Sequence, residues 1–426
     1  MREHFSGWIV RGARQLDWRP RRDGHAGIIA VLGVTQWLAW GSTYYLVTIL
    51  AQPITADTGW PLASVVAGLS IGLIIAGLVS PLVGKAIERH NGRPVLAFGA
   101  MALALGLIAL GLAQDQAAYF LAWAVLGIGM GASLYDAAFA ALGKLYGLRA
   151  RPMIGKLTLI GGLVMTVTWP LSAALVASIG WRGTCFFYAG MHLAVGLPLL
   201  LFLLPTAPPD ATAPTDVATR MPTHERGTQR RRRLLVWLVG TNLTLQIGIG
   251  SVLAVHLMSL LQGLGLDMAM AVALGSLMGA CQVAGRLIEI AVARHLHPVW
   301  EGVAASVLVF VGFALLLGGD SMLIGVALVI YGLGNGVRTI VKGTLPLVLF
   351  GAEGYATLVG RLGMPTLIAQ AAGPALGALV LSRYGVAPTL AMLAGLALVN
   401  LALSYALRIA LPRRAPAARD LSAVPG

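Results

Sequence analysis

The sequence predicts an all-α membrane protein of 12 transmembrane helices, arranged as two pseudo-symmetric six-helix bundles around a central cavity. Three observations predict this fold: the apolar composition, the length of the apolar segments, and a repeat that relates the two halves of the chain. Hydrophobic residues make up 58% of the 426 residues, charged residues make up 11%, and there are 54 glycines. A water-soluble globule does not need so much apolar surface, whereas glycine enrichment favours close helix packing in lipid.

Twelve apolar segments are each long enough to cross a bilayer core of ~30 Å at 1.5 Å per residue. They cover residues 27–50, 60–83, 94–113, 117–143, 153–177, 181–204, 234–261, 268–292, 299–318, 322–348, 355–381 and 386–410. The domain organisation is therefore an N-terminal tail (1–26), a six-helix bundle (27–204), a linker (205–233), a second six-helix bundle (234–410) and a C-terminal tail (411–426).

The charges indicate how the chain lies in the membrane. Lys and Arg gather in the tails and in the loops on one side, and the loops on the other side carry mainly Asp. The positive-inside rule then predicts a multi-pass protein of a bacterial-type inner (plasma) membrane with both termini cytoplasmic. The same distribution accounts for the net charge of +14, so nucleic acid is not an expected partner. The linker ends in Arg230–Arg233, a basic stretch expected to lie against anionic lipid.

The two halves repeat with a shift of about 205 residues. Gly127-Ile-Gly-Met-Gly131 corresponds to Gly332-Leu-Gly-Asn-Gly336, and Gly155-Lys-Leu157 corresponds to Gly360-Arg-Leu362. Parallel six-helix repeats are typical of secondary transporters, whose substrate site lies near the bilayer midplane between the halves.

The loop between the second and third segments, Gly84-Lys-Ala-Ile-Glu-Arg-His-Asn-Gly-Arg-Pro94, resembles a family signature. It is similar to Gly-x-x-x-Asp-Arg-x-Gly-(x)-Arg of the major facilitator superfamily, with Glu88 in place of Asp and Asn91 in place of Gly. Asn tolerates the left-handed conformation, so we expect the turn to survive. The resemblance implies close packing of Gly84 on helix 11 and a conformational latch made by Glu88, Arg89 and Arg93. In the second half, Arg294-His295 occupies the Asp-Arg place, which makes a symmetric latch doubtful.

A second group of motifs resembles the monocarboxylate and oxalate/formate-type branch of that superfamily. It comprises Gly127-x-Gly-x-Gly with Tyr135 on helix 4, the aromatic-basic loop from Leu145 to Arg151, Gly161-Gly162, and Gly180-Trp-Arg-Gly183. The helix 1 signature of the animal members is absent, and Trp40-Gly-Ser-Thr-Tyr-Tyr45 stands there instead. The resemblance places Tyr135 among the substrate-binding candidates.

Ionisable side chains inside a span are costly and are therefore functional candidates. Arg286 lies eight residues before Arg294, about 12 Å from the cytoplasmic end of its helix. Its guanidinium is expected to bind a substrate carboxylate, which the resemblance also implies for a helix 8 arginine; the alternatives are an ion pair with Glu289 at i+3 and a lipid-edge position. Glu289 is a candidate for proton coupling or the counter-ion of Arg286.

Asp136 is the second proton-coupling candidate, because desolvation raises the proton affinity of a carboxylate in an apolar span. The alternative is a structural acid held by Lys156 or Arg338. Arg338 is expected to face the cavity, and Lys342, at i+4, to reach the cytoplasmic interface. Polar residues on helices 1 and 7 complete the substrate-binding candidates, Tyr44, Asn242 and Gln246, although such groups also bridge helices by hydrogen bonds.

The sequence predicts a secondary active transporter that moves a small organic anion, monocarboxylate-like, by alternating access with proton coupling or exchange. The alternative is a proton-driven efflux pump for drug-like or metalloid compounds, and a third reading is a non-transporting membrane sensor. No enzyme motif, phosphate loop or metal cluster is present in the sequence, so no cofactor, metal or catalytic residue is expected. Expected partners are an anionic substrate, protons and membrane lipids, and the protein is expected to be monomeric.

Overall fold

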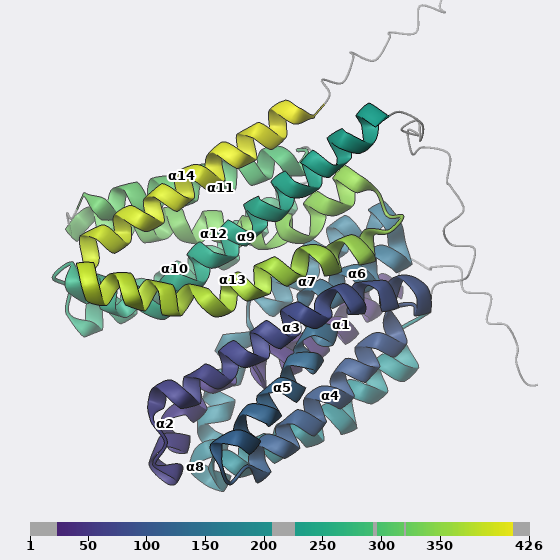
Figure 1. Ribbon diagram of the computed structural model, residues 1–426, viewed down its shortest axis with the longest axis vertical. Helices are drawn as coiled ribbons and strands as arrows, with labels where there is room; N and C mark the ends of the chain where they lie inside the picture. The colour runs from purple at the N-terminus through teal and green to yellow at the C-terminus, as the bar shows by residue number, and fades with distance from the viewer. Residues whose placement is uncertain (1–23, 207–225, 293–295, 319–320, 412–426) are drawn as a thin grey trace, which may run out of the picture.

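A computed structural model describes residues 24–206, 226–292, 296–318 and 321–411, and every described element is a helix (Figure 1). Most of the predicted tails and most of the predicted linker lie outside these ranges. The N-terminal half contains α1 (Gly24–Gly41), α2 (Leu46–Thr58), α3 (Leu62–His90), α4 (Gly92–Leu112), α5 (Gln116–Ser133), α6 (Tyr135–Tyr146), η1 (Gly147–Ala150), α7 (Arg151–Gly161), α8 (Val164–Met191), η2 (His192–Gly196) and η3 (Leu199–Leu203). Here η1 is a 3-10 helix, and η2 and η3 are π-helical turns.

The C-terminal half consists of six long helices. They are α9 (Arg226–Gly263), α10 (Met268–Val292), α11 (Pro298–Leu317), α12 (Ser321–Phe350), α13 (Tyr355–Tyr384) and α14 (Val386–Ala410). The first of them, α9, begins at Arg226, so the basic stretch Arg230–Arg233 forms part of this helix.

Ten helical stretches of the described chain are long and apolar enough to cross a membrane. One of them, Gln116–Leu203, has 88 residues and would reach about 130 Å as a straight helix, about four times the bilayer core. This stretch changes direction at Gly147 and Gly180, where φ is 55° and 73°. Both are left-handed values that glycine adopts without steric cost. It therefore provides three spans, which together with the nine others confirm the twelve predicted spans.

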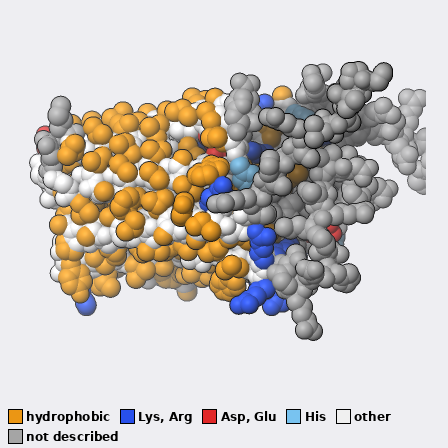
Figure 2. All heavy atoms as spheres, turned by 90° about the horizontal axis from the view of Figure 1, so that it is seen from above, with side chains coloured by type: hydrophobic (Ala, Val, Ile, Leu, Met, Phe, Trp, Pro, Cys, Tyr) orange, Lys and Arg blue, Asp and Glu red, His pale blue; other side chains and the backbone are white. Residues whose placement is uncertain are grey.

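The two ends of the molecule differ in charge. We call the end that carries Lys85, Arg89, Arg93 and Lys144 the basic end, and the end that carries Asp57, Asp115 and Asp267 the opposite end. The first helix begins and the last helix ends at the basic end: the ring of His25 lies 5.0 Å from that of Tyr146, and Arg231 Nη2 donates to the Ala410 carbonyl at 2.6 Å. Figure 2 shows the apolar flank of the molecule, with Lys and Arg gathered towards one end.

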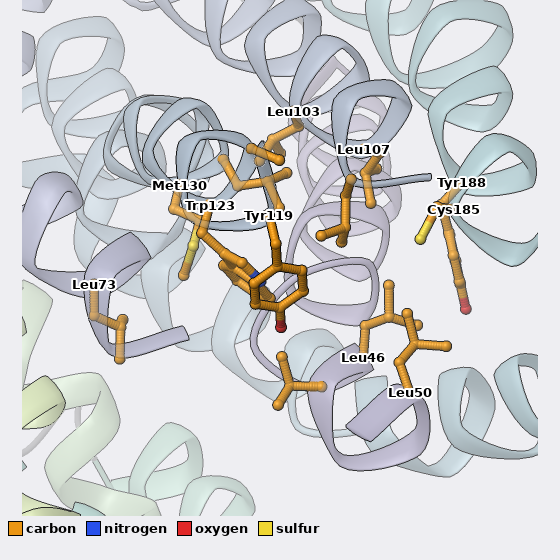
Figure 3. Packing of buried hydrophobic residues seen from close by; sticks show 14 of the residues in the cluster. Leu46, Leu50, Leu73, Leu103, Leu107, Tyr119, Trp123, Met130, Cys185 and Tyr188 are labelled. Carbon is orange, nitrogen blue, oxygen red and sulfur yellow. The ribbon is translucent and has the colours of Figure 1, made fainter. Parts of the chain in front are cut away.

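Each half has its own apolar core. In the N-terminal half, Tyr119 and Trp123 of α5 pack with Leu46 and Leu50 of α2 towards the opposite end (Figure 3). In the C-terminal half, Phe313 and Tyr331 are the large buried side chains of a comparable cluster. The first of these clusters also takes in Leu367 and Ala371 of α13, so apolar packing continues across the boundary between the halves.

The halves contact each other at the basic end. In the N-terminal half α3, α6, η1 and α7 make these contacts, and in the C-terminal half α10, α12 and α13 do. The fourth span continues from α6 into α5 towards the opposite end, and the fifth continues from α7 into α8. In the described chain, α5 and α8 do not pack against the C-terminal half to a comparable extent. Seen in Figure 1, α3 and α13 lie side by side near the basic end and diverge away from it. The conformation is closed at the basic end.

Glycine makes the closest contact between the halves possible. A Cβ on Gly360 would lie 2.5 Å from the Ser80 carbonyl oxygen and 2.9 Å from Gly84 Cα, and a Cβ on Gly84 would collide with the Ala356 carbonyl. The obstacles are backbone atoms, which cannot rotate away. Small residues at such crossings let helix backbones approach closely in a membrane.

We expect Gly84→Ala to disfavour the closed basic end, because the new methyl group meets the backbone of α13. At about 1–3 kcal/mol for overpacking, the ratio of closed to open molecules falls about 5- to 150-fold. Spin-label distances across the basic end measure this ratio. Gly395→Ala is the matched control, since a Cβ on this α14 glycine has no neighbour within 4 Å. An unchanged distance distribution in Gly84→Ala contradicts the expectation.

Candidate functional site

Three spans of the N-terminal half are interrupted inside the membrane. The first breaks between α1 and α2 at residues 42–45, the fourth at Leu134, whose ψ of −176° is extended, and the fifth between Gly161 and Val164. The breaks lie together, because a Cβ on Gly41 would meet the Thr168 side chain and the Tyr135 hydroxyl rests against Gly161. Irregular backbone at this depth is tolerated where it is buried in protein or lines a cavity, and broken helices of this kind build transporter sites.

Two side chains of α1 satisfy carbonyl groups near these breaks. Gln36 Nε2 donates to the Ser133 carbonyl at 2.6 Å, and Trp37 Nε1 donates to the Ile160 carbonyl at 2.8 Å. Trp40 Nε1 in turn donates to Gln36 Oε1 at 3.1 Å. The last carbonyls of a helix need such partners when no water reaches them. Gln36 and Trp37 thus hold the three broken spans in one arrangement.

Five rings form an aromatic cluster at the breaks: Trp40, Tyr44, Tyr45, Tyr135 and Phe139. Ring centroids lie 5.3 Å apart for Trp40 and Tyr135, for Tyr44 and Tyr45, and for Tyr135 and Phe139. Tyr44 also lies close enough to Gln370 of α13 to interact with it, which connects the cluster to the C-terminal half. An aromatic surface with hydroxyl groups suits the carbon skeleton of a small polar ligand.

Arg286 of α10 reaches this cluster from the other half. Its side chain is 8% exposed, its guanidinium lies against Gly162, where a Cβ would collide with Nη1, and it is close enough to Tyr45 and Tyr135 to interact electrostatically. Within the described ranges no hydrogen bond or ion pair engages it, and its buried Nε has no acceptor. The proposed ion pair with Glu289 is not formed, since Glu289 contacts Glu301 of α11 instead.

A bidentate ion pair joins the two halves beside this site. Lys342 Nζ of α12 lies 2.8 Å from Asp136 Oδ1 and 3.0 Å from Oδ2, and the two side chains are 18% and 12% exposed. Asp136 sits in the first turn of α6, where the positive end of the helix favours a carboxylate. Neither Lys156 nor Arg338, the partners proposed from the sequence, makes this contact. The pair borders a small pocket lined by Leu243, Pro346, Val359, Leu362, Gly363 and Thr366.

Lys342 was expected to reach the interface, and its role in this pair was missed. The repeat contained the signal. Asp136 and Lys342 are 206 residues apart, close to the shift of about 205 that relates the halves, so they occupy equivalent places. Equivalent residues near a two-fold axis face each other. The same rule applies to any pair of repeat positions close to that axis.

Asn242 and Arg338 lie in a polar cluster inside the C-terminal bundle. Asn242 Nδ2 donates to Ser404 Oγ at 2.8 Å, Arg338 Nη2 donates to Asn400 Oδ1 at 2.8 Å, and Ser306 joins both partners. These side chains are 1–7% exposed. Gln246 is buried one turn from Asn242 on α9. Substrate binding by these three residues stays a prediction, and in this conformation Asn242 and Arg338 bond within their own half.

The signature loop adopts the expected turn. Asn91 has φ of 69°, and no other non-glycine residue of the described chain has a positive φ. Gly84 packs on α13 as the resemblance implies. Glu88 pairs with Lys144 of its own half at 3.1 Å, whereas Arg89 is exposed and Arg93 half-buried, with no ion pair to a described residue. The latch function of Glu88, Arg89 and Arg93 stays a prediction, and Arg294-His295 lies outside the described residues.

Comparison with known proteins identifies the class. Residues 32–341, well over half of the chain, match the family described as Major Facilitator Superfamily. The chain belongs to this superfamily, and it is a secondary transporter, not an enzyme. No curated protein matches it by sequence.

Solved structures share the fold. The human organic anion transporter MFSD10 (TETRAN) superposes with a TM-score of 0.70 at 18% identity, covering 91% of this chain and 100% of the other. The proton:xylose symporter XylE bound to 6-bromo-6-deoxy-D-glucose gives 0.69 at 12% identity, covering 90% and 96%. The transporter FucP in the outward conformation gives 0.68 at 11% identity, covering 92% and 100%. At these identities the likeness concerns the fold alone.

We expect Gln36→Leu to destabilise the protein, because the Ser133 carbonyl loses its donor in a buried place. An unsatisfied buried acceptor costs about 1–3 kcal/mol, which thermal unfolding in detergent detects as a lower midpoint. Gln262→Leu is the control, since Gln262 is exposed. Equal midpoints for the two variants contradict the role of Gln36 at the break.

Proposed function

We propose that this superfamily member transports a small organic anion, monocarboxylate-like, between Arg286 and the aromatic cluster. The carrying observation is the unpaired guanidinium of Arg286, which is 8% exposed and has no carboxylate partner in the described chain. An unpaired charge in a low-dielectric interior is costly, and a substrate carboxylate offers the bidentate partner that offsets this cost. Placement in the monocarboxylate and oxalate/formate-type branch is part of this proposal.

The position of the site between the halves supports binding of a ligand by both bundles. Tyr44, Tyr45 and Tyr135 stand on the N-terminal half and Arg286 on the C-terminal half, so a ligand between them contacts both bundles. Such a ligand stabilises the conformations in which the bundles approach, which is the requirement for alternating access. At 18% identity, the likeness to an organic anion transporter does not identify the substrate of this chain, so the proposal depends on Arg286.

Proton coupling is proposed at Asp136. Its ion pair with Lys342 joins the halves at the closed basic end, so opening that end requires the pair to break. Protonation of Asp136 removes the charge that holds Lys342 and so favours separation of the halves. Tyr135 precedes Asp136 in the chain and belongs to the aromatic cluster, which links the proton site to the substrate site.

The membrane orientation follows from charge. We propose that the basic end faces the cytoplasm of a bacterial-type inner membrane, with both termini on that side. The protein then acts as a monomer in lipid, and the described conformation is open towards the outside. Neither a cofactor nor nucleic acid has a place in this mechanism.

Arg286→Gln tests the anion site. Hydrogen bonds to a charged group are worth about 1.5–3 kcal/mol, so we expect monocarboxylate affinity to fall about 10- to 150-fold. Ligand-induced thermal stabilisation of the purified protein measures it, against monocarboxylates, dicarboxylates, cationic dyes and metalloid oxyanions. Arg383→Gln removes the same charge at an exposed place and leaves affinity unchanged. Stabilisation by cationic dyes that survives Arg286→Gln, without any carboxylate effect, favours the efflux pump instead.

Asp136→Asn tests the coupling. In proteoliposomes we expect uptake driven by a proton gradient to be lost, while exchange of substrate against substrate continues, because a neutral side chain can no longer alternate between charge states. Radiolabelled substrate measures both activities in the same preparation. Gradient-driven uptake at the unmodified rate shows that another group carries the proton.

A further inference from the structure

The contact of α3 with α13 has a repeat-related counterpart in the contact of α10 with α7. Under the shift of 205 residues, Gly84 corresponds to Glu289 and Gly155 corresponds to Gly360. The contact of Glu289 with Gly155 is therefore the repeat-related equivalent of the contact of Gly84 with Gly360. A Cβ on Gly155 would lie 3.2 Å from Ile290 and 3.8 Å from Glu289 Oε2. Of these two repeat-related crossings, one is thus glycine on glycine, and the other contains a carboxyl group.

Glu289 is enclosed by groups from both halves. Its side chain is 5% exposed and is in hydrogen-bonding contact with Glu301, which is also 5% exposed. Arg151 of α7, in the other half, donates through Nη2 to Glu301 Oε1 at 2.6 Å and to the Leu296 carbonyl at 3.0 Å. Arg151 of the N-terminal half therefore binds Glu301 directly and acts on Glu289 through its charge.

The carboxyl contact requires a proton. Ionised carboxylates have acceptors only, so two of them cannot hydrogen-bond each other, and like charges this close cannot both be ionised. Glu289 Oε1 and Glu301 Oε2 are buried without a donor, and one proton shared between the carboxyls removes this deficit. Glu301 lies in the first turn of α11 and on Arg151, both of which favour its charged form, so the proton belongs to Glu289.

No other described charge compensates this pair. On the neighbouring helices, Lys156 of α7 is exposed, Arg338 binds Asn400, Lys342 binds Asp136, and Arg408 of α14 lies 4.9 Å over the Trp300 ring. Arg231 of α9 binds the Ala410 carbonyl, His297 Nδ1 accepts from the Val299 amide, and Arg286 faces the aromatic cluster. Arg151 is the cation that contacts the pair.

We propose that Glu289 and Glu301 form a proton-binding site, separate from Asp136, that is complete only while Arg151 closes the basic end. When the halves separate there, Arg151 leaves, water reaches both carboxyls, and the proton of Glu289 dissociates into the compartment at the basic end. The proton is bound more tightly in the closed state, so protonation of Glu289 favours the closed basic end, whereas protonation of Asp136 favours its opening. The site goes beyond the proposed function, because it requires neither Arg286 nor a substrate.

Spin-label distances between Leu148→Cys and Ile409→Cys test this site, in a background in which Cys185 and Cys281 are replaced by alanine. Both label positions are exposed, at 55% and 67%. The closed fraction of the parent is expected to fall as the pH rises through the titration of Glu289. Glu289→Gln is expected to stay closed throughout, because its amide donates to Glu301 as the protonated acid does.

Two further variants make the result decisive. Glu353→Gln, at an exposed loop of the basic end, keeps the response of the parent. Glu301→Gln weakens the response, since its amide can donate to an ionised Glu289, and it replaces Glu289→Gln if that variant does not fold. An unchanged pH response in both glutamate variants overturns the proposal while leaving anion binding at Arg286 untouched.

Discussion

The close approach of Gly84 and Gly360 is the constraint on which the rest of the basic end depends. With no side chain between them, α3 and α13 pack backbone against backbone, and this spacing brings the two bundles within reach of each other. The Asp136–Lys342 pair, the contact of Arg286 with Gly162, and the bond from Arg151 to Glu301 all cross the same boundary. Charged groups can meet there because glycine leaves room at the point of closest contact.

The low dielectric of the bilayer explains why polar groups are gathered so tightly. Three spans break at one level, and the exposed carbonyls are satisfied by Gln36 and Trp37 because water is excluded. Arg338 is held by Asn400 within one bundle, whereas Arg286 has no such partner. This contrast between the two buried arginines is the reason that the substrate carboxylate is proposed at Arg286.

The sequence was sufficient for the spans, the repeat, the turn at Asn91 and the burial of Arg286, because hydropathy, local turn chemistry and helical rise are properties of short stretches of chain. The pairing of charges was not predictable in the same way. Arg286 and Glu289 are i and i+3 on one helix, which permits an ion pair. In the structure, however, Arg286 lies against Gly162 and Glu289 contacts Glu301 of α11. The expected position of Lys342 at the interface came from its distance to the helix end, whereas the repeat relation places it opposite Asp136. Partner choice depends on how helices are rotated against each other, and spacing along one helix does not contain that information.

The meeting of Asp136 with Lys342 also says something about the origin of the molecule. The two positions are equivalent in the repeat, so a symmetric pair of identical six-helix units would place the same residue against itself at this point. Two copies of the first unit would bring aspartate against aspartate, and two copies of the second would bring lysine against lysine. The attraction therefore arose only after the two units had diverged in sequence. Since that divergence, each half has carried a charge that favours the other half and repels a copy of itself.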